Sequence, residues 1–207
     1  YARRLAKMQS AIFPTLTEDE HLSESQYLRH LELFPEGQLT VLVLIHDKWV
    51  VAGSTSTFLT TWDYATQDHT FLDVIGGGWF TQHNPKGDWL YGGDLSVHPD
   101  FHGMGVGSAL YRARQAVARK LNLQGEIAGG MIPGYYRYRE QMSIEAYVNK
   151  VEAREVFDPT LSVQVKNGFQ VKRVLHEHIT DPRADNCAAM IVRPNPHYQA
   201  EWGRIRV

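Results

Sequence analysis

Three glycines between a strand-like run and an amphipathic helix form the part of this sequence with the clearest chemical potential. Gly103, Gly105 and Gly107 follow Pro99 in the run His-Gly-Met-Gly-Val-Gly-Ser. The first amides of a helix have no intrahelical partner and lie at the positive end of its dipole, so they favour an anion. A simple connecting turn is the alternative, but one or two glycines suffice for that. The pattern therefore predicts a phosphate or pyrophosphate site.

The spacing of these glycines disagrees with two familiar nucleotide motifs. A dinucleotide fingerprint requires Gly-x-Gly-x-x-Gly/Ala, and its sixth position is Ser108 counted from Gly103, or Leu110 counted from Gly105. A Walker A loop requires Gly-Lys-Ser/Thr, which is absent. A nucleotide-binding oxidoreductase is therefore disfavoured.

The wider motif resembles that of a known superfamily. Val97-x-Pro99-x-x-His102-Gly-x-Gly-x-Gly is similar to the acetyl-CoA signature of the GNAT N-acetyltransferases, in which Arg/Gln-x-x-Gly-x-Gly/Ala opens the central helix. His102 stands where Arg or Gln is usual. The resemblance covers about residues 20–193.

Two further segments resemble a particular subset of these domains. Residues 130–135, and residues 158–161 together with 167–169, look like GNAT domains that are sometimes fused to a carbon–nitrogen hydrolase. No such hydrolase is present in this chain.

The resemblance implies how the co-substrate, acetyl-CoA, is held without a metal. Amides of the turn would bind the pyrophosphate, and the preceding strand would pair with the pantetheine arm and direct one amide at the thioester oxygen. The implied cofactor-binding residues are Leu95, Ser96, Val97, His102, Gly103, Met104, Gly105, Val106, Gly107 and Ser108.

Acyl transfer to an amine requires a group that removes a proton, because an amine with a pKa near 10 is almost wholly protonated at pH 7. Asp94, His98 and Tyr91 are the candidate bases; the alternative roles are a purely structural carboxylate for Asp94 and a plain strand-end residue for His98. Strand alternation places Asp94 and Ser96 on one face, and Tyr91 and Leu95 on the other.

The leaving thiolate needs a proton, and many family members supply it from a tyrosine. The matching position here is Gln164, which cannot act as an acid. The candidate replacements are Tyr135, Tyr136, Tyr138 and Tyr147, of which Tyr135 and Tyr147 are preferred, and water is another. Packing is the alternative role for these tyrosines. We also expect residues 63–88 and 133–138 to wall the acceptor side.

The hydrophobic periodicity predicts an α+β fold with a single parallel crossover. We expect a GNAT-like mixed, mainly antiparallel sheet of six or seven strands flanked by helices, with a splayed strand pair that holds acyl-CoA. One domain is expected over residues 1–207, with a core of about 20–193 and a C-terminal extension at 194–207. The predicted helices are 17–34, 71–74, 105–121, 143–156 and 158–167, and the predicted strands are 41–46, 49–59, 89–97, 125–132, 169–178 and 188–193.

Composition limits the partners that we expect. The formal net charge is −2, so no nucleic-acid footprint is apparent, and no apolar run is long enough for a membrane span. One cysteine, Cys187, precludes an internal disulfide and fits a cytoplasmic location. The predicted activity is acetylation of a small-molecule or peptide primary amine in a ternary complex. A non-catalytic acyl-CoA-binding or sensing module is the alternative, and a homodimer contact stays open.

Overall fold

The computed structural model describes residues 1–203 and 205, and its core is one six-stranded sheet. The strands, in the spatial order β1-β2-β3-β4-β6-β5, are β1 (Gln38–Ile45), β2 (Lys48–Thr60), β3 (Trp89–Val97), β4 (Gly125–Met131), β6 (Ala188–Pro194) and β5 (Gln170–Leu175). The helices are α1 (Ala2–Ile12), α2 (Glu24–Leu33), α3 (Trp62–Ala65), α4 (Phe71–Val74), α5 (Val106–Lys120), α6 (Ile144–Glu152) and α7 (Leu161–Lys166). This confirms the predicted α+β class and strand count.

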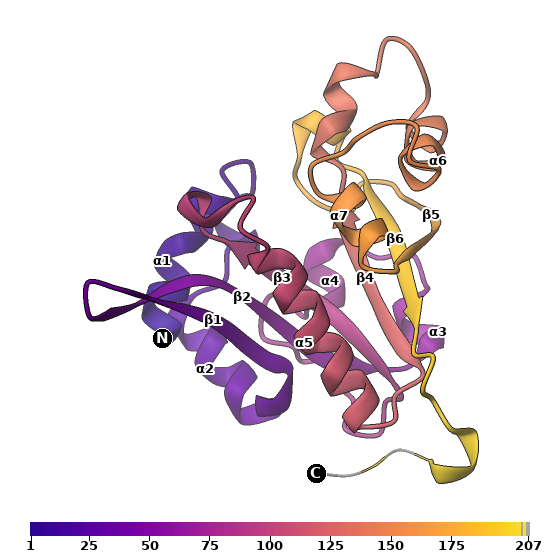
Figure 1. The fold of residues 1–207 in the computed structure, drawn as a ribbon. Helices are drawn as coiled ribbons and strands as arrows, with labels where there is room; N and C mark the ends of the chain where they lie inside the picture. Colours follow the sequence, from indigo (N-terminus) through magenta and orange to yellow (C-terminus); the bar gives the residue numbers. More distant parts are fainter. Residues whose placement is uncertain (204, 206–207) are drawn as a thin grey trace.

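The sheet consists of two antiparallel halves joined by one parallel pair, β3 and β4. Their ladder contains only three residue pairs, of which Tyr91 with Ile127 is the last. Beyond that pair the strands separate, and Figure 1 shows the two halves of the sheet diverging from their shared lower end. The predicted splayed pair is therefore present. We call the diverging segments, residues 94–97 of β3 and 128–131 of β4, the wedge.

Helices cover the two faces of the sheet unequally. Helix α5 packs through Val106 and Leu110 against one face, and α6 and α7 extend that layer over the β4–β6–β5 half. Helices α1 and α2 cover the opposite face, where Leu5 and Tyr27 pack with Phe58 of β2. The two faces of the sheet are thus covered by different helices.

A bulge at Gly93 changes which side chains share a face of β3. Thr57 of β2 pairs with Gly92, whereas Ser56 pairs with Asp94, so Gly93 is the extra residue. The inserted residue reverses the alternation that the sequence implied. Tyr91 therefore belongs to the core cluster on the α1–α2 side, the side on which Asp94 also contacts Tyr27. Our expectation that Tyr91 faces away from Asp94 was wrong.

The N-terminal helical region is divided differently from the prediction. Thr17 and Glu20 do form a capping box, but it closes only a short 3-10 turn. Helix α2 begins later, with Ser23 as its N-cap. Leu28 and Leu31 are about half exposed, and the buried residues of α2 are Gln26, Tyr27 and His30.

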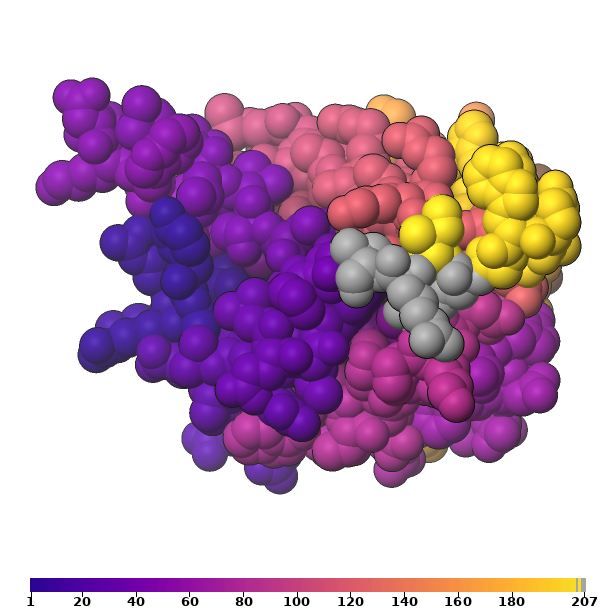
Figure 2. All heavy atoms as spheres, turned by 90° about the horizontal axis from the view of Figure 1, so that it is seen from below, coloured from indigo at the N-terminus to yellow at the C-terminus, as the bar shows by residue number. Residues whose placement is uncertain are grey.

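The C-terminal segment, residues 194–203, packs beside the end of α5 (Figure 2, yellow). Asn122 Nδ2 donates to the carbonyls of Gln199 at 2.8 Å and Gly203 at 2.6 Å, which attaches the segment to the body of the protein. Trp202 stays 64% exposed. The segment is held by hydrogen bonds more than by apolar burial.

Candidate functional site

The turn before α5 requires glycine because of its backbone conformation. Gly103 has φ = 74° and Gly105, the N-cap of α5, has φ = 81°. A methyl group added at either position would meet no atom within 4 Å. The glycines are therefore needed for their left-handed conformation, and the surface of the turn is open.

The turn leaves a group of amides available to a ligand. Among residues 1–203 and 205, no acceptor binds the amides of Gly103, Gly105, Val106, Gly107 and Ser108. The amides of His102 and Met104 instead donate to carbonyls inside the turn, at 3.0 and 3.4 Å. Five of the seven predicted turn residues, 102–108, thus offer free amide donors at the positive end of a 15-residue helix.

Side chains attach this turn to its surroundings. His102 Nε2 lies 3.0 Å from the carbonyl oxygen of Val97, which connects the turn to the end of β3. Asn167 Nδ2 donates to Ser108 Oγ at 3.2 Å, and Gln115 donates to the Asn167 carbonyl at 3.0 Å. The sequence prediction missed Asn167, although it precedes the Gly-Phe pair that carried the resemblance.

The predicted pantetheine strand lies on the wedge. Leu95 and Val97 are partly buried against the α5 side, whereas Ser96 faces the α1–α2 side. None of these residues has a β4 partner, because the β3–β4 ladder ends at Tyr91. This edge of β3 therefore has backbone groups that can pair with an extended ligand, as in β-augmentation.

Asp94 lies at the start of the wedge, immediately after the bulge. Ser96 Oγ lies 3.0 Å from each of its carboxylate oxygens, and Tyr27 Oη donates to Oδ2 at 3.3 Å. Burial raises the pKa of Asp94 to about 6, although hydrogen bonds from Ser96 and Tyr27 oppose the rise. A carboxyl with such a pKa accepts a proton near neutral pH and returns it readily.

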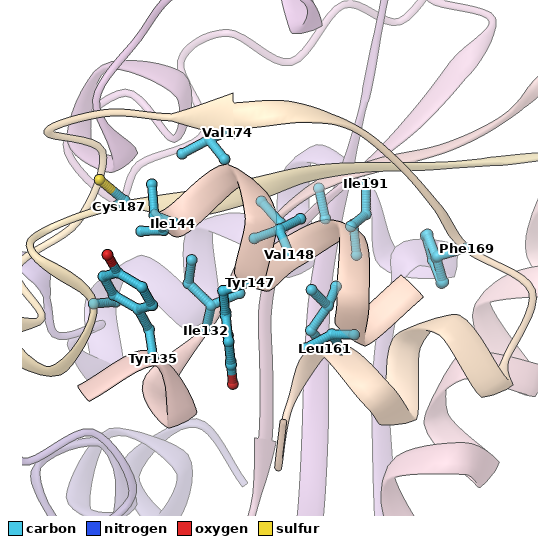
Figure 3. Packing of buried hydrophobic residues seen from close by; sticks show 14 of the residues in the cluster. Ile132, Tyr135, Ile144, Tyr147, Val148, Leu161, Phe169, Val174, Cys187 and Ile191 are labelled. Atoms are coloured by element: carbon cyan, nitrogen blue, oxygen red, sulfur yellow. The ribbon is translucent and has the colours of Figure 1, made fainter. Parts of the chain in front are cut away.

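The two candidate acids, Tyr135 and Tyr147, both donate their hydroxyl hydrogens to other protein groups. Tyr147 is fully buried, and its hydroxyl donates to Asp158 Oδ2 at 2.8 Å. Tyr135, 6% exposed, donates to the Met142 carbonyl at 3.2 Å. Figure 3 shows the two hydroxyl oxygens pointing away from one another within one core cluster. The structure does not bring them together with Asp94 in a shared contact.

A different phenol, Tyr111 of α5, lies beside Gln164, the residue at the position where many family members have a tyrosine. Gln164 is 6% exposed and its carboxamide lies against Gly130 of the wedge. Burial raises the pKa of Tyr111, while the charge of Arg114 and a hydrogen bond from Gln164 lower it. Sequence reasoning missed Tyr111, because its spacing matches the apolar face of α5.

The aromatic loops expected to wall an acceptor contribute partly to the core. Phe80 is 1% exposed and stacks on His30 with centroids 3.6 Å apart. Trp79 and Tyr136 are exposed, so they are the members of these loops that a partner molecule can contact.

The described part of the chain contains neither a candidate metal site nor a candidate membrane span. No group of three or more His, Cys, Asp or Glu side chains there could hold a metal ion. His176 and His178 do not share a strand face, because β5 ends at Leu175 and His178 turns inward to the His69 carbonyl. No described helix has the length and apolar character that crossing a membrane requires.

Comparison with known proteins identifies the class of this protein. A family model described as the acetyltransferase (GNAT) family matches residues 13–129, which is more than half of the chain. The chain belongs to the GNAT acetyltransferase family. Family membership supports an enzyme role in acyl transfer from an acyl-CoA.

Particular relatives differ in how much of their length the chain covers. It is 37% identical over 183 residues to the probable hydrolase YhcX of Bacillus subtilis (strain 168), spanning 87% of this chain but only 34% of that protein. It is 29% identical over 197 residues to the uncharacterized N-acetyltransferase YkwB of the same organism, spanning 95% of this chain and 85% of the relative. The chain thus spans about a third of the hydrolase relative.

Solved structures share the fold at low identity. The GphF GNAT-like decarboxylase in complex with isobutyryl-CoA superposes with a TM-score of 0.79 at 19% identity and covers 94% of both chains. This likeness shows that the chain has a GNAT-like fold. The matched decarboxylase is the protein that was solved with a bound acyl-CoA.

Proposed function

We propose that this protein transfers an acetyl group from acetyl-CoA to a primary amine of a small molecule or peptide. One observation carries the proposal: the open amides of the Gly103–Ser108 turn and the Asp94 carboxyl, with its pKa near 6, lie at the two ends of the unpaired edge of β3. The unpaired edge of β3, residues 94–97, thus has a base at one end and an anion site at the other.

In the proposed reaction, both substrates are held in one ternary complex. The pyrophosphate binds the turn amides, and the pantetheine arm pairs with Leu95, Ser96 and Val97. The amine nitrogen attacks the thioester carbon, and a β3 amide stabilises the oxyanion that develops. The proton of the amine passes to Asp94, directly or through one water.

The carbon–sulfur bond then breaks, its electron pair stays on sulfur, and the thiolate takes up a proton. We propose that Tyr111 supplies this proton, since its phenol adjoins Gln164 beside the wedge. Tyr135 and Tyr147 stay as predictions from the sequence, but their hydroxyls already donate to Met142 and Asp158.

An amine panel tests the activity. The protein is incubated with acetyl-CoA and primary amines of differing charge and size, and free thiol and acetylated amine are both quantified. The proposal expects thiol release that depends on the amine. If CoA binds in calorimetry but no amine supports turnover, the result favours a non-catalytic acyl-CoA-binding module over an amine acetyltransferase.

A second candidate function is the decarboxylation of a carboxyacyl-CoA. The likeness to a GNAT-like decarboxylase along 94% of both chains favours it. In that reaction the bond from the α carbon to the carboxylate breaks, its electrons form the thioester enolate, CO2 leaves, and the α carbon takes a proton. Malonyl-CoA supplied without an amine discriminates the candidates, because only a decarboxylase would convert it to acetyl-CoA.

A further inference from the structure

We propose that Gln9 and Tyr27 position the Asp94 carboxyl for proton transfer, so that the N-terminal helix α1 is a working part of the active site. Helix α1 precedes the segment that the family model matches, residues 13–129. The inference rests on the proposed function, because it assigns a role to groups that act through the base. It goes beyond that function by assigning a role to Gln9, which lies outside the matched segment, and to Tyr27, which lies inside it.

A directed chain of hydrogen bonds leads from α1 to Asp94. Gln9 Nε2 donates to Tyr27 Oη at 2.7 Å, and Tyr27 Oη donates to Asp94 Oδ2 at 3.3 Å. The Leu22 amide donates to Gln9 Oε1 at 3.4 Å, which fixes the carboxamide with its NH2 group toward the phenol. The phenol accepts from Gln9, and its own hydrogen is therefore directed at Asp94.

The side chains in this series of hydrogen bonds are buried, so the loss of any one bond would be costly in free energy. Gln9 and Tyr27 are 3% and 4% exposed, and Gln9 is a polar residue on the inward face of α1 next to Leu5. A buried polar side chain is costly unless its hydrogen bonds are made. An apolar residue would pack α1 without that cost, so packing alone does not account for a glutamine here.

Burial raises the pKa of Asp94, and four groups from four elements oppose that rise. They are Gln9 of α1, Tyr27 of α2, Ser96 of β3 and, by its charge alone, Arg114 of α5. Each favours the carboxylate against the burial that disfavours it. Removal of the Tyr27 hydroxyl or the Gln9 carboxamide should therefore raise the pKa of Asp94 and leave the base protonated over a wider pH range.

The experiment compares Tyr27→Phe and Gln9→Ala with two matched controls. Ser10→Ala alters the exposed neighbour on α1, and Tyr198→Phe removes a phenol from the C-terminal segment. The acidic limb of kcat/KM should move upward by about half to one pH unit in the two test variants. Activity at pH 6 should then fall several-fold while the plateau at high pH changes little. The controls should match the unaltered protein.

A titration of the carboxyl carbon of labelled Asp94 by NMR, assigned by its absence in Asp94→Asn, provides a readout without turnover. A raised carboxyl pKa in both test variants supports the positioning role. An unchanged pKa in both, or an equal loss of activity at every pH, overturns it. Failure of every amine to be acetylated by the unaltered protein overturns the proposed function alone, because the carboxyl titration does not depend on it.

Discussion

Arg114 Nε lies 3.0 Å from Glu126 Oε2, and these two oppositely charged side chains are only 2% and 0% exposed. Arg114 comes from α5 and Glu126 from β4, where Glu126 pairs with Leu90 one position before the β3–β4 ladder ends. The Arg114 guanidinium also lies against Gly92, beside the bulge. The ion pair thus attaches the central helix to both strands at the point where they separate.

Breaking this pair should be costly, because one charge would stay buried without its partner. We expect Glu126→Ala to lower the free energy of unfolding by about 3–5 kcal/mol. The exposed Lys150–Glu155 pair, at 2.8 Å, is the matched control, and Glu155→Ala should change stability by less than about 1 kcal/mol. Chemical denaturation measures both. Equal losses in the two variants would contradict the structural role of the buried pair.

The turn glycines offer a test that separates ligand binding from backbone strain. Gly105 and Gly77 both have positive φ, 81° and 62°, and an added methyl group meets nothing within 4 Å at either position. Gly105→Ala and Gly77→Ala should therefore lose similar stability, about 1 kcal/mol each.

Only Gly105→Ala should weaken the binding of CoA, because its methyl group would occupy the open surface where the phosphates are expected to bind. We expect a loss of affinity of about tenfold or more in calorimetry, equivalent to about 1.4 kcal/mol. Equal CoA affinities in the two variants would show that the turn is not the pyrophosphate site.

The raised pKa of Asp94 makes stability depend on pH. Because the pKa of Asp94 is about 6 in the folded state, above its ordinary value of 3.8, the folded state binds the proton more tightly. Folding is then favoured most below pH 4, and that contribution is lost as the pH rises toward 6.

Asp94→Asn removes this titration. The variant should match the unaltered protein at pH 4 and be more stable at pH 8, by about 1–2 kcal/mol after allowance for partial exposure. Thermal unfolding at the two pH values measures the difference. A variant that is less stable at pH 8 would mean that the carboxylate is a structural anchor, which is the alternative role of Asp94.

Two tyrosines distinguish the proposed acid from a packing residue. Tyr111→Phe should lower kcat by about tenfold or more if its phenol protonates the thiolate. Tyr147→Phe should leave kcat nearly unchanged but lower stability by about 1–3 kcal/mol, since Asp158 would lose a buried donor. Gln164→Ala should have a modest effect on kcat. A reversed result for the two tyrosines would restore Tyr147 as the acid.

Local sequence signals predicted the elements that depend on local physics. The glycines at 103 and 105 adopt the left-handed conformation that the motif requires, and the hairpin of β1 and β2 and strand β3 lie close to their expected bounds. The position of the bulge at Gly93 could not be predicted, because two adjacent glycines do not indicate which of them is the inserted residue. The chain from Gln9 to Asp94 was also missed, since its members are far apart in sequence and meet only through packing of α1.

The most direct test of the proposed activity is a stoichiometric comparison of the unaltered protein with Asp94→Asn, using the best amine from the panel. The proposal predicts one acetylated amine for each free thiol in the unaltered protein. Asp94→Asn should reduce the rate by about a hundredfold or more with the Kd for CoA unchanged. Thiol released without acetylated amine, or a variant that reacts at the normal rate, would contradict amine acetylation with Asp94 as its base.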